Sequence, residues 1–174
     1  MIGTGKIHVL YGNGKGKSTS LAGMTLRAAS HGLKVLYYQC FEEKSPGERL
    51  ILDQIKGVTC LPGPEKVKKY QLLNSDEKKE WKRYYLKAFD EIVKFCPNFD
   101  MLILDNMLDA LALGIISEEK LFTFLDRKPR GLEVILTGKD ITARLEETAD
   151  YITYLEKVKH PADEHKISRE GIEY

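Results

Sequence analysis

The feature that most constrains the fold of this chain is a glycine-rich segment at residues 12–19, placed between an apolar run and a helical pattern. The run Ile7–Tyr11 has the composition of a buried strand. A strand that ends in a glycine-rich turn and enters a helix directs several backbone N–H groups at one point, where the helix dipole also favours an anion. The segment therefore predicts a phosphate-binding loop within a strand–loop–helix unit.

Two side chains carry the chemistry expected of this loop. Lys17 supplies a mobile positive charge for phosphates, and Ser18 supplies a hydroxyl for a magnesium ion. In the usual pattern, a glycine, four residues and then Gly-Lys-Ser/Thr, the first glycine position is occupied here by Tyr11, and Gly12 comes one place late. The loop is therefore a variant. The sequence leaves open whether Lys15, inside the loop, faces solvent or reaches a phosphate.

Composition narrows the class of protein. The chain has 174 residues, 43% hydrophobic and 30% charged, with a net charge of +1, so we expect a single globular domain over residues 1–174 that does not bind nucleic acid. Its longest apolar runs, such as residues 101–104, are too short to span a membrane, which predicts a soluble cytoplasmic protein. Cys40, Cys60 and Cys96 lack metal-site spacing and are interpreted as free thiols.

Apolar runs alternate with helical patterns along the chain. We expect strands at residues 7–11, 35–39, 58–61, 101–105, 133–137 and 151–155, and helices at 17–30, 48–55, 75–95, 117–126 and 142–147. Continuously hydrophobic strands, each followed by a crossover helix, favour a parallel sheet covered on both faces. The prediction is a doubly wound α/β domain with a mainly parallel, six-stranded sheet, like the phosphate-loop (RecA-like) NTPases, with ligands beyond the carboxyl ends of the strands.

Asp105 is a second candidate for the site, because it ends the apolar strand Met101–Asp105. In phosphate-loop proteins, an acid on the strand beside the loop holds the metal directly or through water. The alternative is a helix N-cap or a turn, where Asp is also favoured. With a phosphate loop in the same chain, we interpret Asp105 as part of a metal site.

Other polar and aromatic groups have plainer explanations. Glu48 and Arg49, at a helix start, are most often solvated charges, and residues 159–161 are unremarkable by composition. The aromatic residues of the long helix recur on one face, which is typical of core packing or an oligomer contact. They are Trp81, Tyr84, Tyr85 and Phe89.

Taken together, these pieces resemble the corrinoid adenosyltransferase family, the ATP:cob(I)alamin enzymes of cobalamin biosynthesis. The likeness covers nearly the whole chain. It is carried by residues 11–19, 27–29, 31–32, 39, 41, 47–49, 104–105, 129, 134–138, 149–150, 158–160 and 171–174. The family's loop has the same displaced first glycine, so the likeness is more specific than a generic phosphate loop.

The resemblance implies transfer of the 5′-deoxyadenosyl group of ATP to the cobalt of a reduced corrinoid, with triphosphate released. It implies that Lys17 and Ser18 are catalytic.

The implied ATP-binding residues are Gly12, Asn13, Gly14, Lys15, Gly16, Lys17, Ser18, Thr19 and, as a weaker contact, Arg27. The implied ligands of a magnesium or manganese ion are Ser18, Asp105 and Asn106. The implied corrinoid region contains Glu48, Lys159 and His160. A homodimer and an electron donor such as a flavoprotein are also implied.

The chain departs from the family pattern at several positions. Asn106 stands where the family has a Glu that helps to hold magnesium, and a neutral amide binds a hard cation more weakly than a carboxylate. Lys128 and Lys139 replace two family arginines, so charge is kept but bidentate geometry is lost. Two alternatives therefore stay open at this point. One is a diverged relative that binds ATP or a corrinoid without transferase activity, and the other is an unrelated phosphate-loop kinase or hydrolase.

Overall fold

The computed structural model describes residues 3–42, 47–164, 169 and 171–172. Its strands are β1 (Ile7–Tyr11), β2 (Val35–Gln39), β3 (Val58–Cys60), β4 (Met101–Asp105), β5 (Glu133–Gly138) and β6 (Tyr151–Tyr154). Its α-helices are α1 (Lys17–Ser30), α2 (Arg49–Leu52), α3 (Ser75–Phe95), α4 (Met107–Ala112), α5 (Glu118–Arg127) and α6 (Ala143–Thr148). Short 3₁₀ turns are η1 (Tyr70–Leu72), η2 (Cys96–Asn98) and η3 (Pro161–Glu164).

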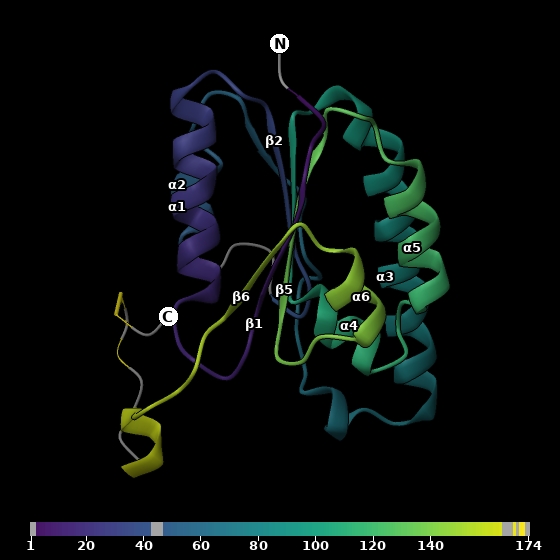
Figure 1. The fold of residues 1–174 in the computed structure, drawn as a ribbon. Helices are drawn as coiled ribbons and strands as arrows, with labels where there is room; N and C mark the ends of the chain where they lie inside the picture. Colours follow the sequence, from purple (N-terminus) through teal and green to yellow (C-terminus); the bar gives the residue numbers. More distant parts are fainter. Residues whose placement is uncertain (1–2, 43–46, 165–168, 170, 173–174) are drawn as a thin grey trace.

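The strands form one parallel sheet in the order β3-β2-β4-β5-β1-β6. Helices α1 and α2 cover one face, and α3, α4, α5 and α6 cover the other (Figure 1). The doubly wound, six-stranded α/β prediction is confirmed. Strand β1 lies between β5 and β6, so the residues that follow β1 emerge between the ends of two neighbouring strands.

The largest hydrophobic cluster joins the sheet to α3, α4, α5 and α6. Helix α3 begins with a capping box: the Asn74 side chain accepts from the N–H groups of Asp76 and Glu77, and the Glu77 carboxylate accepts from the Asn74 N–H. Of the four aromatic residues expected to pack on one face, Tyr85 and Phe89 are buried and Trp81 is partly buried against the core, whereas Tyr84 is exposed. The cap and the buried face together fix where this long helix starts and how it is oriented.

Most expected boundaries are confirmed within a residue or two, but α4 was not predicted and α2 is shorter than expected. Helix α4 starts directly after β4, because Asn106 takes the left-handed conformation (φ 57°) and turns the chain at once. Asparagine tolerates this conformation better than most residues. The turn brings Asp109, on α4, to the edge of the sheet where the phosphate loop lies, which matters for the site.

The cysteines and the helices also bear on the class of protein. The three cysteines are free thiols, Cys40 and Cys96 buried and Cys60 partly exposed, as predicted. Within the described part of the chain, no helix has both the length and the apolar character to cross a membrane.

The two phenylalanines of α3 give a matched test of this core. Phe89 is 2% exposed and Phe95 is 50% exposed. Phe89→Ala should lower the free energy of unfolding by roughly 3–5 kcal/mol, because it removes a buried ring and leaves a cavity. Phe95→Ala should change it by less than about 1 kcal/mol, since a surface change away from special features has a small effect. Urea denaturation of both variants checks this, and equal losses would contradict the assigned core.

Candidate phosphate and metal site

The glycine-rich loop is held by backbone hydrogen bonds to both neighbouring strand ends. On one side, the Gly12 N–H donates to the carbonyls of Gly138 (3.2 Å), the last residue of β5, and Lys139 (2.9 Å), the residue after it. On the other side, the Gly14 N–H donates to the Leu155 carbonyl, just after β6, at 2.8 Å. The loop is therefore fixed at the carboxyl edge of the sheet, where ligands bind in this fold class.

Close approach explains why glycines occupy the loop. A Cβ on Gly14 would lie 2.7 Å from the Leu155 carbonyl oxygen and 2.9 Å from that of Glu156. Gly12 has no room for a Cβ against the same Leu155 carbonyl, and its φ is 118°. Tyr11, at the usual first glycine position, instead packs its ring against Tyr154 at a centroid distance of 5.1 Å. The displaced glycine thus follows from the segment after β6 lying directly on the loop.

The side chains of the loop contact the loop itself and the C-terminal part of the chain. The Lys17 ammonium donates to the carbonyls of Gly12 (2.7 Å) and Gly14 (2.9 Å), so it lies within the curve of the loop. The Asn13 carboxamide oxygen accepts from the Lys157 N–H at 2.9 Å. The Lys15 ammonium donates to the Ile172 carbonyl at 2.9 Å. The sequence left the direction of this side chain open, and in the structure it contacts the C-terminal part of the chain.

Helix α1 starts at the loop. Gly16 is its N-terminal cap residue with φ 102°, a conformation that a residue with a side chain rarely adopts. Backbone N–H groups at such a helix start are ready donors to an anion. Ser18 and Thr19 follow in the first turn, and the Thr19 hydroxyl donates to the Glu48 carboxylate at 3.4 Å. Glu48, expected in the corrinoid region, therefore borders the loop.

Asp105 is fully buried beside Ser18. Its carboxylate accepts hydrogen bonds from the hydroxyls of Thr137, Ser18 and, at 3.4 Å, Tyr37. Burial raises the pKa of Asp105 above the usual aspartate value, while the hydrogen bonds from Thr137 and Ser18 favour the ionised form. The structure therefore brings two of the three expected metal-site residues together: the buried Asp105 carboxylate orients the Ser18 hydroxyl at the start of α1.

Asn106 forms hydrogen bonds that link the end of β4 to β5 and to the residue after β2. Its N–H donates to the Thr137 hydroxyl at 2.9 Å, and its carboxamide nitrogen donates to the Cys40 carbonyl at 3.2 Å. Phe41, next to Cys40, also has a positive φ of 63°. The two left-handed residues therefore lie at adjacent strand ends and are linked through Cys40. Metal binding by the Asn106 oxygen stays a prediction.

The residues described in the structure contain no group of three or more His, Cys, Asp or Glu side chains arranged to hold a metal ion. A metal in this site would depend on the Ser18 hydroxyl and on the phosphates of a bound nucleotide, with the Asp105 carboxylate behind the serine. This donor set suits a hard ion such as Mg²⁺, which retains several waters and commonly binds through few protein ligands plus substrate phosphates.

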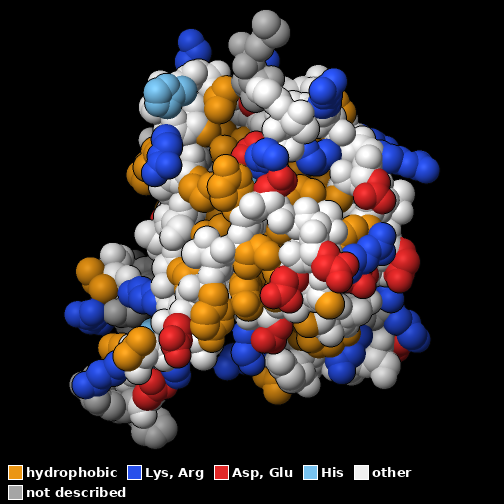
Figure 2. Space-filling model, in the orientation of Figure 1, with side chains coloured by type: hydrophobic (Ala, Val, Ile, Leu, Met, Phe, Trp, Pro, Cys, Tyr) orange, Lys and Arg blue, Asp and Glu red, His pale blue; other side chains and the backbone are white. Residues whose placement is uncertain are grey.

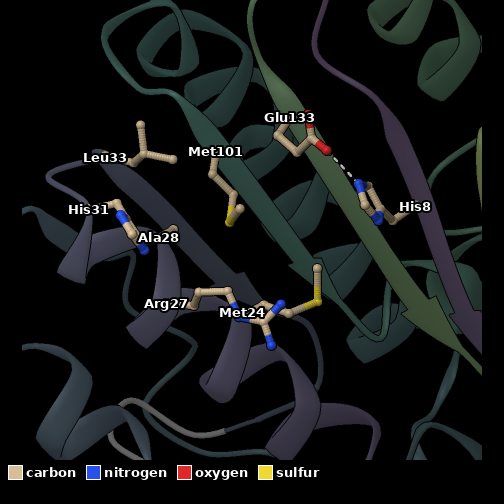
Figure 3. Close-up of a pocket in the computed structure, with 8 residues that line it drawn as sticks. All are labelled: His8, Met24, Arg27, Ala28, His31, Leu33, Met101 and Glu133. Carbon is tan, nitrogen blue, oxygen red and sulfur yellow. Dashed lines mark hydrogen bonds and ion pairs between the residues drawn. The ribbon is translucent and has the colours of Figure 1, made fainter. Parts of the chain in front are cut away.

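Arg27, expected as a weaker ATP contact, is not brought near the loop. It lies ten residues along α1 and lines a cavity of about 240 Å³ near the amino ends of β1, β4 and β5 (Figure 3). The other lining residues are His8, Met24, Ala28, His31, Leu33, Met101 and Glu133. On its strand side, the His8 ring and the Glu133 carboxylate are 2.5 Å apart.

Lys159 and His160, also expected in the corrinoid region, lie on the segment that follows β6. This segment contacts the loop at Leu155 and Lys157, so both residues are only a few positions beyond the phosphate site. Of the matched C-terminal residues, 173–174 lie outside the described part of the chain.

The interpretation of Arg49 as a solvated charge is wrong. Its side chain is 2% exposed and donates to the Leu61 carbonyl at 2.6 Å. A guanidinium at the start of a short helix can extend under a neighbouring loop instead of into solvent, and hydrophobic spacing does not distinguish these cases. Arg49 thereby ties α2 to the segment after β3.

Asp109 is a candidate that sequence reasoning missed. Its half-buried carboxylate accepts from the Lys139 N–H at 3.2 Å. Burial raises the pKa of Asp109, while this hydrogen bond and the charge of Lys17 act in the opposite direction. Asp105 and Asp109 are four residues apart, which is about one helical turn. That spacing is the only signal in the sequence, and it becomes informative once a helix is known to follow β4 directly.

The sequence of this chain is similar to a known protein family and to several of its named members. A family model described as ATP:corrinoid adenosyltransferase BtuR/CobO/CobP matches residues 3–174. A protein of Sinorhizobium sp named corrinoid adenosyltransferase is 30% identical over 183 residues, covering 98% of this chain and 80% of that protein. Proteins with the same name from Escherichia coli strain K12 and Pseudomonas aeruginosa are 29% and 28% identical, covering 98% of this chain and 86% and 84% of their own lengths.

Two glycines test the close contact between the loop and the segment after β6. Gly14→Ala should weaken ATP binding at least tenfold, because its Cβ would meet backbone oxygens that cannot move aside cheaply. Gly23→Ala, in open space within α1, should leave ATP binding unchanged and stabilise the fold by about 0.5–1 kcal/mol. Isothermal titration calorimetry and thermal melting distinguish the two, and normal ATP binding by Gly14→Ala would refute the contact.

Proposed function

The chain belongs to the ATP:corrinoid adenosyltransferase family, and we propose that it transfers the 5′-deoxyadenosyl group of ATP to the cobalt of a reduced corrinoid, releasing triphosphate. The observation that carries this proposal is the loop with its displaced glycine. Its N–H groups, Lys17 and Ser18 gather at one carboxyl edge of the sheet, and the family match extends over the whole described chain.

The chemistry requires little bond-making by the protein. Cobalt(I) attacks the ribose 5′-carbon of ATP with its electron pair, the bond between that carbon and the phosphate oxygen breaks, and cobalt becomes formally cobalt(III). The breaking bond leaves its electrons on triphosphate. The protein has to align the two reactants and stabilise the negative charge that gathers on the leaving group. The N–H donors of the loop and the Lys17 ammonium can stabilise the negative charge on the leaving triphosphate.

Within this proposal, each residue at the loop has a distinct task. The backbone from Gly12 to Thr19 and the Lys17 ammonium bind the triphosphate, and Lys17 moves from loop carbonyls to phosphate oxygens. Asp105 is a positioning residue that orients the Ser18 hydroxyl. A magnesium or manganese ion held through Ser18, when bound, supplies further neutralisation of the triphosphate charge.

The remaining parts of the proposal rest on the family and on position. We place the corrinoid near the carboxyl edge of the sheet, within reach of Glu48, Lys159 and His160. A homodimer, a flavoprotein electron donor and a cytoplasmic location belong to the same proposal. Arg27 is left out of the nucleotide site of a single chain, because it lies near the amino ends of the strands (Figure 3).

A spectroscopic assay tests this function. The protein is mixed with ATP, magnesium and chemically reduced cobalamin, and the absorbance change of the cobalt–carbon bond is followed and then reversed by light. Lys17→Ala should lower the rate roughly 100-fold or more, since it removes a preorganised charge from the leaving group. Lys15→Ala is the matched control in the same loop, and we expect a much smaller loss. Tight ATP binding with no light-sensitive product would favour a non-catalytic relative and overturn the proposal.

Asn106 allows a separate test of the metal. If it occupies a metal-ligand position, Asn106→Glu should tighten manganese binding in the presence of ATP, because a carboxylate binds a hard cation better than an amide. Asn106→Asp provides the comparison, since Asp tolerates the left-handed backbone better than Glu. Electron paramagnetic resonance titration of Mn²⁺ measures both. An unchanged affinity in both variants would show that residue 106 does not contact the metal.

A further inference from the structure

We propose that Asp109 is a positioning residue for Lys17, acting through the turn that follows β5. The proposal rests on the loop binding the phosphates of ATP, as set out above. Its basis is a continuous series of contacts from the Asp109 carboxylate to the Lys17 ammonium.

The series passes through backbone groups at each step. The Asp109 carboxylate accepts from the Lys139 N–H at 3.2 Å. The Lys139 carbonyl in turn accepts from the Gly12 N–H at 2.9 Å, and the Gly12 carbonyl accepts from the Lys17 ammonium at 2.7 Å. Asp109 therefore positions the turn that accepts the Gly12 N–H. Gly12 in turn supplies one of the two carbonyls that the Lys17 ammonium contacts.

The turn is tightly confined, so a change at Asp109 will be transmitted. A Cβ on Gly138 would lie 2.5 Å from the Leu108 Cβ, 3.0 Å from the Asp109 nitrogen and 3.1 Å from the Asp109 carboxylate. Helix α4 thus packs directly on the end of β5, with no layer of side chains between them. Close-packed contacts of this kind do not relax continuously. Losing the carboxylate would leave the Lys139 N–H without its acceptor and loosen the turn beneath the loop.

Charge supports the same role. The positive charges of Lys17 and Lys139 both favour the ionised Asp109 carboxylate, and the acid next in the chain to Lys139, Asp140, opposes it. The two acids lie close to the same turn, but Asp109 is half-buried and accepts from the Lys139 N–H, whereas Asp140 is exposed. Asp140 is therefore a matched control for charge near the loop.

The test uses ATP binding without a corrinoid, followed by steady-state kinetics. Asp109→Ala should weaken binding of magnesium-ATP about tenfold, the effect of losing one hydrogen bond to a charged acceptor. Asp109→Asn keeps an acceptor oxygen for the Lys139 N–H and should restore affinity to within about threefold of the starting protein. Asp140→Ala should leave it unchanged. In kinetics, Asp109→Ala should raise the KM for ATP and leave the KM for the corrinoid unaltered.

A double-mutant cycle shows whether Asp109 acts through Lys17. In a Lys17→Ala background, Asp109→Ala should cause no further loss of ATP affinity, because the group it positions is gone. Full additivity of the two losses would overturn the proposal, and so would an unchanged affinity in Asp109→Ala or a tenfold loss in Asp109→Asn. Thermal melting confirms that each variant is folded, and Asp109→Asn keeps the test decisive if the alanine variant is not. Failure of the starting protein to form a cobalt–carbon bond would reject the proposed function while leaving this binding comparison intact.

Discussion

The close contact of the phosphate loop with the strand ends on either side of it is the constraint on which the site depends. Strand β1 lies between β5 and β6, so the residues after β1 emerge between two neighbouring chain segments. Gly12 binds the turn after β5, and Gly14 binds the segment after β6. Neither glycine has room for a side chain. The position of the loop is thus set by the order of strands in the sheet, and its composition follows from the space left to it.

This arrangement suits the binding of a leaving group. A reaction in which cobalt supplies the electron pair needs a surface that is already shaped for a highly charged triphosphate, because donors that need not reorganise stabilise developing charge most effectively. The loop N–H groups are fixed by the sheet, Lys17 lies within the loop, and Ser18 is oriented by a buried carboxylate. Helix α4 adds a support beneath the loop through Asp109. Figure 2 shows the face of the molecule along which β6, an edge strand with exposed side chains, runs in the orientation of Figure 1.

Most of the strands and part of the site were predictable from the sequence. The features that were not predictable depend on single backbone conformations or on packing between distant segments. Buried parallel strands are continuous apolar runs, so β1, β2 and β4 were predicted with their observed boundaries. The pairing of Ser18 with Asp105 followed from the loop and from parallel strand ends meeting at one edge. Helix α4 was missed because a single left-handed residue, Asn106, turns the chain, and local propensity does not reveal that. The burial of Arg49 and the remote position of Arg27 depend on packing between distant segments, which periodicity does not report.

The proposed function depends on the loop holding an intact triphosphate as the leaving group of adenosyl transfer. Phosphorus-31 NMR of the reaction mixture tests it most directly, with the protein, magnesium and ATP incubated with and without reduced cobalamin. We expect free triphosphate in amounts equal to the adenosylated corrinoid formed, and no product from ATP when the corrinoid is left out. Orthophosphate or diphosphate released without a corrinoid would contradict it and identify the loop as that of a hydrolase or kinase.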